Sequence, residues 1–250
     1  MIGDVFSGTY LFKPIGGEML TIIYSYYNSS KALGIQIDNW SQYPIELMKE
    51  LHFILIDDCS DSKADLKINF PINLTLMKVT DDIPWNQPGA KNLGFKFAKT
   101  DWVFTSDIDH VIQPEMCGKL IELKKDKKTV YYFSRLTDKG ESRDPHPNSF
   151  LIHKDVFWEL GGYDEDFCGH YGYDDILLRT MIQSCCKTEN LNSINLINYP
   201  SLYSSDLDRS RRKNKRLLKR KKKQLQKGKY QNKRILRFNW ELIKNLNTAS

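Results

Sequence analysis

The sequence lacks several features that would assign it to a membrane or secreted class. It has no apolar run near the roughly 20 residues that a membrane-spanning helix needs, and its N-terminus has no basic stretch followed by an apolar one. Its five cysteines are odd in number and include no Cys-x-x-Cys pair, which indicates a reducing compartment and argues against a zinc site. We therefore expect a cytoplasmic protein, with peripheral attachment to a membrane left open.

Acidic residues are absent from residues 209–237, which contain 16 of the 37 lysines and arginines. The rest of the chain has 21 basic and 31 acidic residues, so its net charge is −10 although the whole chain carries +6. The sequence thus describes an acidic body with a basic, helix-prone tail. With 250 residues, 27% of them charged and 40% hydrophobic, the chain can form one globular domain with a sizeable core and an appendage.

The most informative stretch is an apolar run that ends in two acids. Trp102, Val103 and Phe104 are typical of a buried strand, and Asp107 and Asp109 follow them. Residues two apart project to the same side of an extended chain, so both carboxylates can face one point beyond the strand. Hard oxygen ligands of this kind suit Mg²⁺ or Mn²⁺, usually shared with a substrate phosphate. Taken alone, an Asp-x-Asp pattern also fits a polar turn with a helix N-cap.

Strands alternate with helices along the chain. We expect strands near residues 21–24, 53–56, 74–78, 102–104, 129–134 and 150–153. The continuous apolar run at 53–56 suits a strand buried on both faces, as in a parallel sheet. The fold class is therefore α/β, with ligands bound outside the carboxyl ends of the strands. We divide the chain into an N-terminal extension (1–20), an α/β domain (21–205) and a basic helical tail (206–250).

Five short motifs in a fixed order carry a family resemblance. They are Asp57-Asp58-x-Ser60, Gly89-Ala90-Lys91-Asn92-Leu93-Gly94, Asp107-x-Asp109, Gly161-Gly162-Tyr163-Asp164-Glu165-Asp166-Phe167 and Gly172-x-Asp174-Asp175. Over roughly residues 21–185, their order and spacing resemble the inverting GT-A glycosyltransferases. The sequence is most similar to family 2, with a C-terminal half similar to the galactosyltransferase and polypeptide N-acetylgalactosaminyltransferase type. The resemblance implies the GT-A fold, a Rossmann-like, mainly parallel mixed sheet flanked by helices.

The resemblance implies a nucleotide site at the first two strands. The aromatic loop after the first strand and the Asp-Asp-x-Ser loop hold the base and ribose in the family. The residues at these positions are Tyr26, Tyr27, Asp57 and Asp58.

The resemblance also implies a diphosphate site on the second and third motifs. Lys91 and Asn92 would border the donor, and Lys91 replaces the arginine of the family, which keeps the charge but loses the bidentate fork. Asp107 and Asp109 match the metal-binding Asp-x-Asp that holds the diphosphate through Mn²⁺ or Mg²⁺, and Asp107 also borders the nucleotide-sugar.

The last two motifs match the acceptor side of the family's site. The loop with Asp164, Glu165 and Asp166 would lie beside the acceptor. Asp174 and Asp175 stand where the family has a Glu-Asp pair that includes the catalytic base. By position we favour Asp175 as the base and Asp174 as the residue that orients the acceptor. A base there would take the proton of the acceptor hydroxyl opposite the leaving diphosphate, so the anomeric configuration inverts.

A third metal ligand is the main departure from the family. Many relatives use a histidine beyond the base, but no histidine follows His170 in this chain. His110, beside the Asp-x-Asp, and His146, in the loop before the strand at 150–153, are the two substitutes, although a lone histidine has many structural roles.

Together these roles predict a metal-dependent inverting glycosyltransferase. It would move a hexosyl or N-acetylhexosaminyl group from a nucleotide-diphosphate sugar, by expectation a UDP-sugar, to a hydroxyl of a saccharide or lipid-linked glycan. One alternative acceptor is a modified base in DNA. Another alternative is a nucleotide-sugar-binding protein without turnover, against which the complete set of acids argues.

Three roles for the basic tail remain open at this stage. It could be a solvated helix packed on the acidic body, a surface for anionic lipid near a lipid-linked acceptor, or a contact to nucleic-acid phosphates. We predict recruitment to an anionic surface, with lipid ahead of DNA because the family acts more often on saccharides than on nucleic acid.

Overall fold

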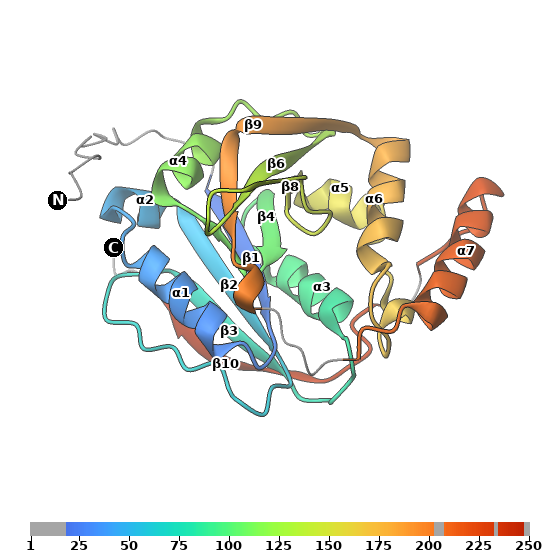
Figure 1. Ribbon diagram of the computed structural model, residues 1–250, viewed down its shortest axis with the longest axis horizontal. Coiled ribbons are helices and arrows are strands. Elements are labelled where there is room, and N and C mark those ends of the chain that lie inside the picture. The colour runs from blue at the N-terminus through green and yellow to red at the C-terminus, as the bar shows by residue number, and fades with distance from the viewer. Residues whose placement is uncertain (1–18, 203–207, 233–234, 248–250) are drawn as a thin grey trace.

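A mixed β-sheet forms the centre of the molecule (Figure 1). The computed structural model describes residues 19–202, 208–232 and 235–247, and these form ten strands in one sheet. The strand order is β10-β3-β2-β1-β4-β8-β6-β9-β5, with β7 paired to β6. The strands are β1 (Leu20–Tyr26), β2 (Leu51–Asp58), β3 (Leu74–Val79), β4 (Trp102–Asp107), β5 (His110–Ile112), β6 (Thr129–Thr137), β7 (Ser142–Arg143), β8 (Phe150–His153), β9 (Lys187–Asn198) and β10 (Trp240–Leu246).

Helices cover both faces of this sheet. On one face, α1 (Ser30–Trp40), α2 (Ile45–Lys49) and α4 (Pro114–Glu122) contribute to one apolar core. On the other face, α3 (Gln87–Phe97), α5 (Lys154–Glu159) and α6 (Asp174–Cys185) contribute to a second core. Two 3₁₀ turns, Glu165–Phe167 and Pro200–Leu202, complete the helical elements together with α7 (Arg212–Gln226), which lies at the outer side of α6 (Figure 1). This arrangement confirms the predicted α/β fold with a sheet between helical layers.

Parallel pairing in the middle of the sheet brings the carboxyl ends of three strands together. β1 pairs parallel to both β2 and β4, with Tyr26 opposite Asp57 and Ser25 opposite Asp107. The strands β1 and β2 are buried along their whole length, as their continuous apolar runs predict. The expected donor-binding loops therefore leave the sheet at one common edge.

The C-terminal segment is only partly the helical tail that we expected over residues 206–250. Its basic part forms α7, but Trp240–Leu246 is strand β10, which pairs antiparallel with β3 at the edge of the central sheet. Alternation of apolar and polar residues is weak in β10, whose residues are mostly exposed, so periodicity alone did not reveal it.

Three further expectations concern the N-terminal extension, the cysteines and membrane-spanning segments. The N-terminal extension over residues 1–20 lies outside the described residues except for its last two positions, of which Leu20 already belongs to β1. All five cysteines are free thiols. In the part of the chain that the structure describes, no helix combines the length and apolarity needed to cross a bilayer.

Candidate active site

A cleft of about 620 Å³ lies at the carboxyl edge of the parallel strands. Seven of the residues expected in the site line it, and they come from three strand ends and from α6. These are Tyr26, Tyr27, Asp58, Asp107, Asp109, Asp174 and Asp175. The fold thus brings both predicted pairs of aspartates, which are far apart in sequence, to one cavity.

Asp107 is held by one lysine and one amide, with a histidine close by. Its Oδ1 accepts hydrogen bonds from Lys91 Nζ (2.8 Å) and Gln87 Nε2 (2.7 Å), and its Oδ2 lies 3.5 Å from His146 Nδ1. Burial alone would raise the pKa of the Asp107 carboxyl, but Lys91 and, less strongly, His146 and His110 lower that pKa well below its usual range. Asp107 is therefore ionised throughout the physiological range, as a metal ligand must be. Lys91 is fully buried and does not line the cleft, so it acts through Asp107.

Asp109 is oriented by a histidine with a defined tautomer. His110 Nδ1 lies 2.9 Å from Asp109 Oδ1, and His110 Nε2 lies 3.0 Å from Arg135 Nη1. Because an arginine only donates, Nε2 must accept, and the ring proton sits on Nδ1 and is donated to Asp109. Both ring nitrogens of His110 are thus engaged in hydrogen bonds.

Three groups at this point are close enough to share a divalent cation. Ligand atoms of Asp107, Asp109 and His110 lie within 4.8 Å of one another, and two of the three are hard carboxylates of the kind that Mg²⁺ and Mn²⁺ prefer. His146, the other expected candidate, packs against His110 with ring centroids 5.0 Å apart. Burial lowers the pKa of His146 to about 4, so its imidazole is neutral at pH 7.

Asp174 and Asp175 open helix α6 at the opposite side of the cleft. The residue before them, Tyr173, has φ of 73°, a conformation rarely adopted by residues with a side chain and one found at functional sites. Burial raises the pKa of both carboxyls, and in Asp174 the neighbouring Asp175 raises it further. Asp175 Oδ1 accepts from the Ile176 N–H at 2.7 Å, whereas Asp174 Oδ2 is buried and has no hydrogen-bond partner within the described part of the chain. This pair can hold or accept a proton near neutral pH.

The two acids of the Asp-Asp-x-Ser loop have different surroundings. Asp57 accepts hydrogen bonds from the Ser60 and Ala64 N–H groups, at 2.9 and 3.2 Å, and does not line the cleft. Asp58 lines the cleft, and burial raises its pKa to about 7 even though Asn86 donates to it at 2.9 Å. Asp57 thus shapes the loop, while Asp58 faces the space where a nucleotide would bind.

The expected acceptor loop is turned away from the cleft. Asp164, Glu165 and Asp166 are absent from the cleft lining, and the first two are 2% exposed. Lys221 of α7 contacts Asp164 Oδ2 at 2.8 Å and Asp166 Oδ2 at 2.6 Å, and Tyr230 donates to Asp164 at 2.9 Å. The basic tail therefore packs on this acidic loop, which was the simplest of the three roles considered for it.

Asn92 connects the same loop to helix α3. Its amide donates to the Tyr163 carbonyl (2.9 Å) and to Glu165 Oε1 (2.8 Å) and accepts from the Tyr163 N–H (2.9 Å). Gly162 is required here because its φ is +67° and a Cβ would meet the Asn92 amide oxygen at 2.8 Å. Asn92, like Lys91, supports the site from behind rather than lining it.

Four residues in the cleft were missed by the sequence analysis. Trp85 and Tyr171 pack with ring centroids 4.6 Å apart, and Arg209 and Arg211 lie over these rings at 5.2 to 5.8 Å. Trp85 stands in the Pro- and Gly-rich loop before α3, the one available signal, while nothing local indicates that the start of the tail returns to the site.

A family model describes most of the part of the chain that builds this site. It is the model for glycosyl transferase family 2, and it matches residues 21–176, which span every predicted motif. The chain belongs to glycosyl transferase family 2. This confirms the resemblance drawn from the five motifs.

Known proteins agree with this glycosyltransferase assignment in sequence and fold. An uncharacterized glycosyltransferase of Haemophilus influenzae is 23% identical over 105 residues, which are 42% of this chain and 34% of that protein. TarS (residues 1–349) of S. aureus in complex with UDP-GlcNAc has a TM-score of 0.61 at 14% identity, covering 72% of this chain and 58% of TarS. The mannosyltransferase PcManGT of Pyrobaculum calidifontis with GDP-Man and Mn²⁺ has a TM-score of 0.56 at 15% identity, covering 74% and 58%. GalNAc-T7 with UDP, GalNAc and Mn²⁺ has a TM-score of 0.58 at 14% identity, covering 78% and 45%.

These likenesses establish the GT-A fold for the glycosyltransferase chain. The matched part of the chain spans about a third of its sequence relative and little more than half of the TarS fragment.

Proposed function

We propose that the protein is a metal-dependent inverting glycosyltransferase that uses a nucleotide-diphosphate sugar, with UDP as the preferred nucleotide. The single observation that supports this most is the meeting of two carboxylate pairs in one cleft. Asp107 and Asp109 come from the end of β4, and Asp174 and Asp175 from the start of α6. Asp107 of the first pair has a lowered pKa and both acids of the second pair have a raised pKa, which suits one metal site and one base.

The donor half of the proposal uses the end of the parallel sheet. Tyr26, Tyr27 and Asp58 would hold the base and ribose, and Asp107 and Asp109 would hold Mn²⁺ or Mg²⁺. When bound, the cation neutralises the charge of the leaving diphosphate. Lys91 and His110 keep the two carboxylates in place through the hydrogen bonds at 2.8 and 2.9 Å.

The acceptor half uses helix α6. Asp175 is partly exposed to the cleft, so we assign it as the base that takes the proton of the acceptor hydroxyl, with Asp174 orienting the same hydroxyl. The rings of Trp85 and Tyr171 provide an apolar wall of the kind on which sugar rings stack. This favours a saccharide or a lipid-linked glycan as the acceptor.

A nucleotide-sugar panel tests the proposal directly. Thermal unfolding is measured with UDP-, GDP- and other nucleotide-sugars, with and without Mn²⁺, because a ligand that binds the native state raises stability with its occupancy. We expect protection by a UDP-sugar that requires Mn²⁺ and is abolished by EDTA. Protection without any donor hydrolysis or transfer would favour the non-catalytic binding protein, and protection by no nucleotide-sugar would contradict the proposal.

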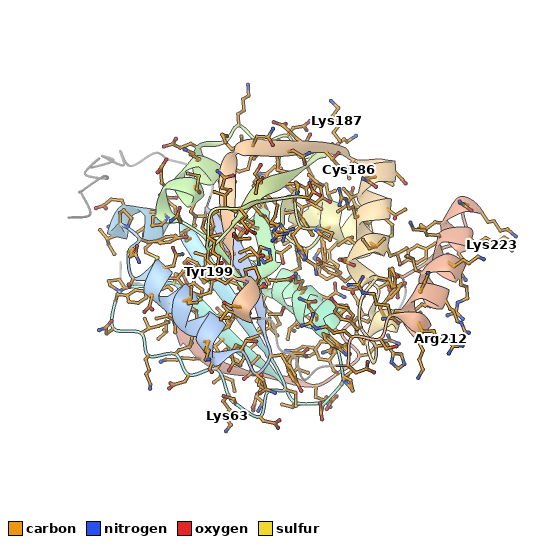
Figure 2. The ribbon with its side chains drawn as sticks, in the orientation of Figure 1. Lys63, Cys186, Lys187, Tyr199, Arg212 and Lys223 are labelled. Atoms are coloured by element: carbon orange, nitrogen blue, oxygen red, sulfur yellow. The ribbon has the colours of Figure 1, made fainter. Side chains whose placement is uncertain are left out.

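A second part of the proposal concerns helix α7, which we propose binds an anionic lipid surface. One side of α7 packs on the body through Asn214 and Lys221, and the other presents exposed basic side chains (Figure 2). The exposed residues are Arg212, Lys213, Lys215, Arg216, Lys219, Arg220 and Lys223. Clustered Lys and Arg gain about 1 kcal/mol each near an anionic membrane.

Co-sedimentation with vesicles tests this surface. Vesicles with and without phosphatidylserine are compared with duplex DNA in a gel shift, for the parent and for a variant with glutamine at Arg216, Lys219, Arg220 and Lys223. We expect salt-sensitive binding to the anionic vesicles that the variant loses. Stronger binding to DNA would support the alternative acceptor, and binding to neither would limit α7 to packing on the body.

A further inference from the structure

The start of the C-terminal tail contributes two cations to the cleft. Arg209 and Arg211 line it beside Asp174 and Asp175, although they lie outside the region that the family model matches. Their guanidinium groups lie over the Tyr171 ring, at 5.3 and 5.2 Å from its centroid. The tail is thus part of the binding cavity as well as a surface element.

Contacts on both sides fix this short segment. On one side, Trp85 Nε1 donates to the Asp208 carbonyl at 2.9 Å. On the other, the buried amide of Asn214 donates to the carbonyls of Phe167, His170 and Gly172, at 2.9, 2.6 and 3.0 Å. This three-carbonyl anchor, three residues after Arg211, sets the position of that residue relative to the loop that precedes the base.

Arg211 forms no ion pair with an acid among the described residues. It acts on Asp175 only at longer range, where it lowers the pKa of that carboxyl and so opposes the effect of burial. A guanidinium over an aromatic ring is weakly hydrated and keeps its fork of N–H donors for a planar or tetrahedral anion. Helix α7 begins at the next residue with no acid in its first turn, so its dipole adds to the attraction for an anion.

We propose that Arg209 and Arg211 form a phosphate-binding subsite between the aromatic pair and the base. This inference rests on the proposed function. The phosphate has two sources within that function: the diphosphate of the donor, or a phosphate group carried by the acceptor. In either case the tail determines which substrates the site accepts.

Matched double variants test the subsite. Arg209→Gln with Arg211→Gln removes both cations, and Arg212→Gln with Arg216→Gln removes two exposed arginines of α7 as the control. A variant with lysine at 209 and 211 keeps the charge and tests rescue. The probes are UDP in Mn²⁺, and inorganic phosphate added to protein saturated with UDP and Mn²⁺.

The two sources give different results. If the donor supplies the phosphate, UDP affinity falls about 10- to 100-fold in the 209/211 glutamine variant and partly recovers in the lysine variant. If the acceptor supplies it, UDP affinity is kept, and binding of phosphate to the UDP-loaded protein is lost. Equal binding of both probes by the 209/211 and 212/216 variants would overturn the subsite.

The same variants separate this inference from the proposed function. If the parent binds no nucleoside diphosphate, the proposed function fails, and the subsite is then tested by phosphate binding to the protein alone, again against the 212/216 control. If the 209/211 glutamine variant unfolds at a lower temperature than its control, its loss of binding is assigned to impaired folding. The lysine variant, which keeps the packing on Tyr171, then decides whether the two cations bind phosphate.

Discussion

Two groups of acids, ten residues apart in sequence, differ in how their charges are satisfied. Asp164 and Asp166 share the buried Lys221, and Glu165 accepts from the Asn92 amide and the Leu236 N–H. In contrast, Asp174 has a buried oxygen without a partner and a raised pKa. Nearly every charge of the first group is paired. Among the described residues the second group has no cationic partner, Asp175 accepts a hydrogen bond from the Ile176 N–H, and both acids line the cleft.

The difference distinguishes structural from functional carboxylates. A buried acid with cationic and N–H partners holds the fold together, because removing one partner leaves an uncompensated charge. A buried acid without partners costs stability and is expected where function needs it. In this comparison the Gly-Gly-Tyr-Asp-Glu-Asp-Phe loop is an anchor for the tail, and the acids of α6 are the ones that line the cleft, where we propose the base.

Replacing Asp175 should have the largest effect on turnover. Asp175→Asn keeps the shape but cannot accept a proton, so we expect kcat for sugar transfer to fall by about 10²- to 10⁴-fold with donor affinity unchanged. Asp166→Asn is the matched control, with kcat within a few-fold of the parent. Steady-state kinetics and donor titration measure these effects in both variants. Equal turnover of the two variants would exclude Asp175 as the base.

Replacing Lys221 should have the largest effect on stability. Lys221→Met leaves the 2% exposed Asp164 without its cation, for which we expect a loss of about 3 kcal/mol in the free energy of unfolding. The partner Asp166 is 39% exposed and adds little to this loss. Lys223→Met, on the exposed side of α7, should stay within about 0.5 kcal/mol of the parent. Denaturant unfolding of both proteins measures this, and equal stability would show that the loop is not anchored by α7.

The pH dependence of transfer should follow the acids of α6 rather than those of β4. Burial raises the pKa of both Asp174 and Asp175, so the base becomes protonated at a higher pH than an ordinary aspartate, whose pKa is about 4. Asp107 has a lowered pKa and stays ionised as the base becomes protonated. We expect kcat to fall about tenfold per pH unit below the pKa of the base. A kcat that stays constant down to the pH at which an ordinary aspartate titrates, about 4, would contradict the assignment.

Asp58 should influence how the stability of the protein without ligand depends on pH. Its pKa is raised from 3.8 to about 7 by burial, so the folded state binds its proton more tightly than the unfolded state. The stability that this proton contributes is complete below about pH 4 and is lost as the pH rises towards 7, at about 1.4 kcal/mol per pKa unit. Asp58→Asn should remove this part of the decline, which unfolding at pH 5 and pH 8 measures. An unchanged pH profile would refute the raised pKa.

The fold and most of the cleft could be predicted from the sequence because they depend on local patterns. Apolar runs such as 53–56 mark buried strands, and acids directly after them must lie at the carboxyl edge of a parallel sheet. These two rules locate Asp58, Asp107 and Asp109.

The orientation of the loop at 164–166 and the course of the tail could not be predicted in this way. They depend on contacts between residues more than 50 positions apart, such as Lys221 with Asp166 and β10 with β3. From the sequence alone these acids indicate a flexible acceptor loop, because the cations that pair with them are distant in the sequence. Arg209 and Arg211 escaped notice for the same reason, because a basic run has no periodicity that indicates a return to the cleft.

The central claim, that the acids lining the cleft bind the substrates and the acids paired with Lys221 only hold the tail, is tested most directly by one measurement. This is the rise in unfolding temperature produced by UDP and Mn²⁺ in two amide variants, Asp109→Asn and Asp166→Asn. The account predicts that Asp109→Asn loses the rise, whereas Asp166→Asn keeps the full rise. Loss of the rise in Asp166→Asn, or its retention in Asp109→Asn, would contradict the account.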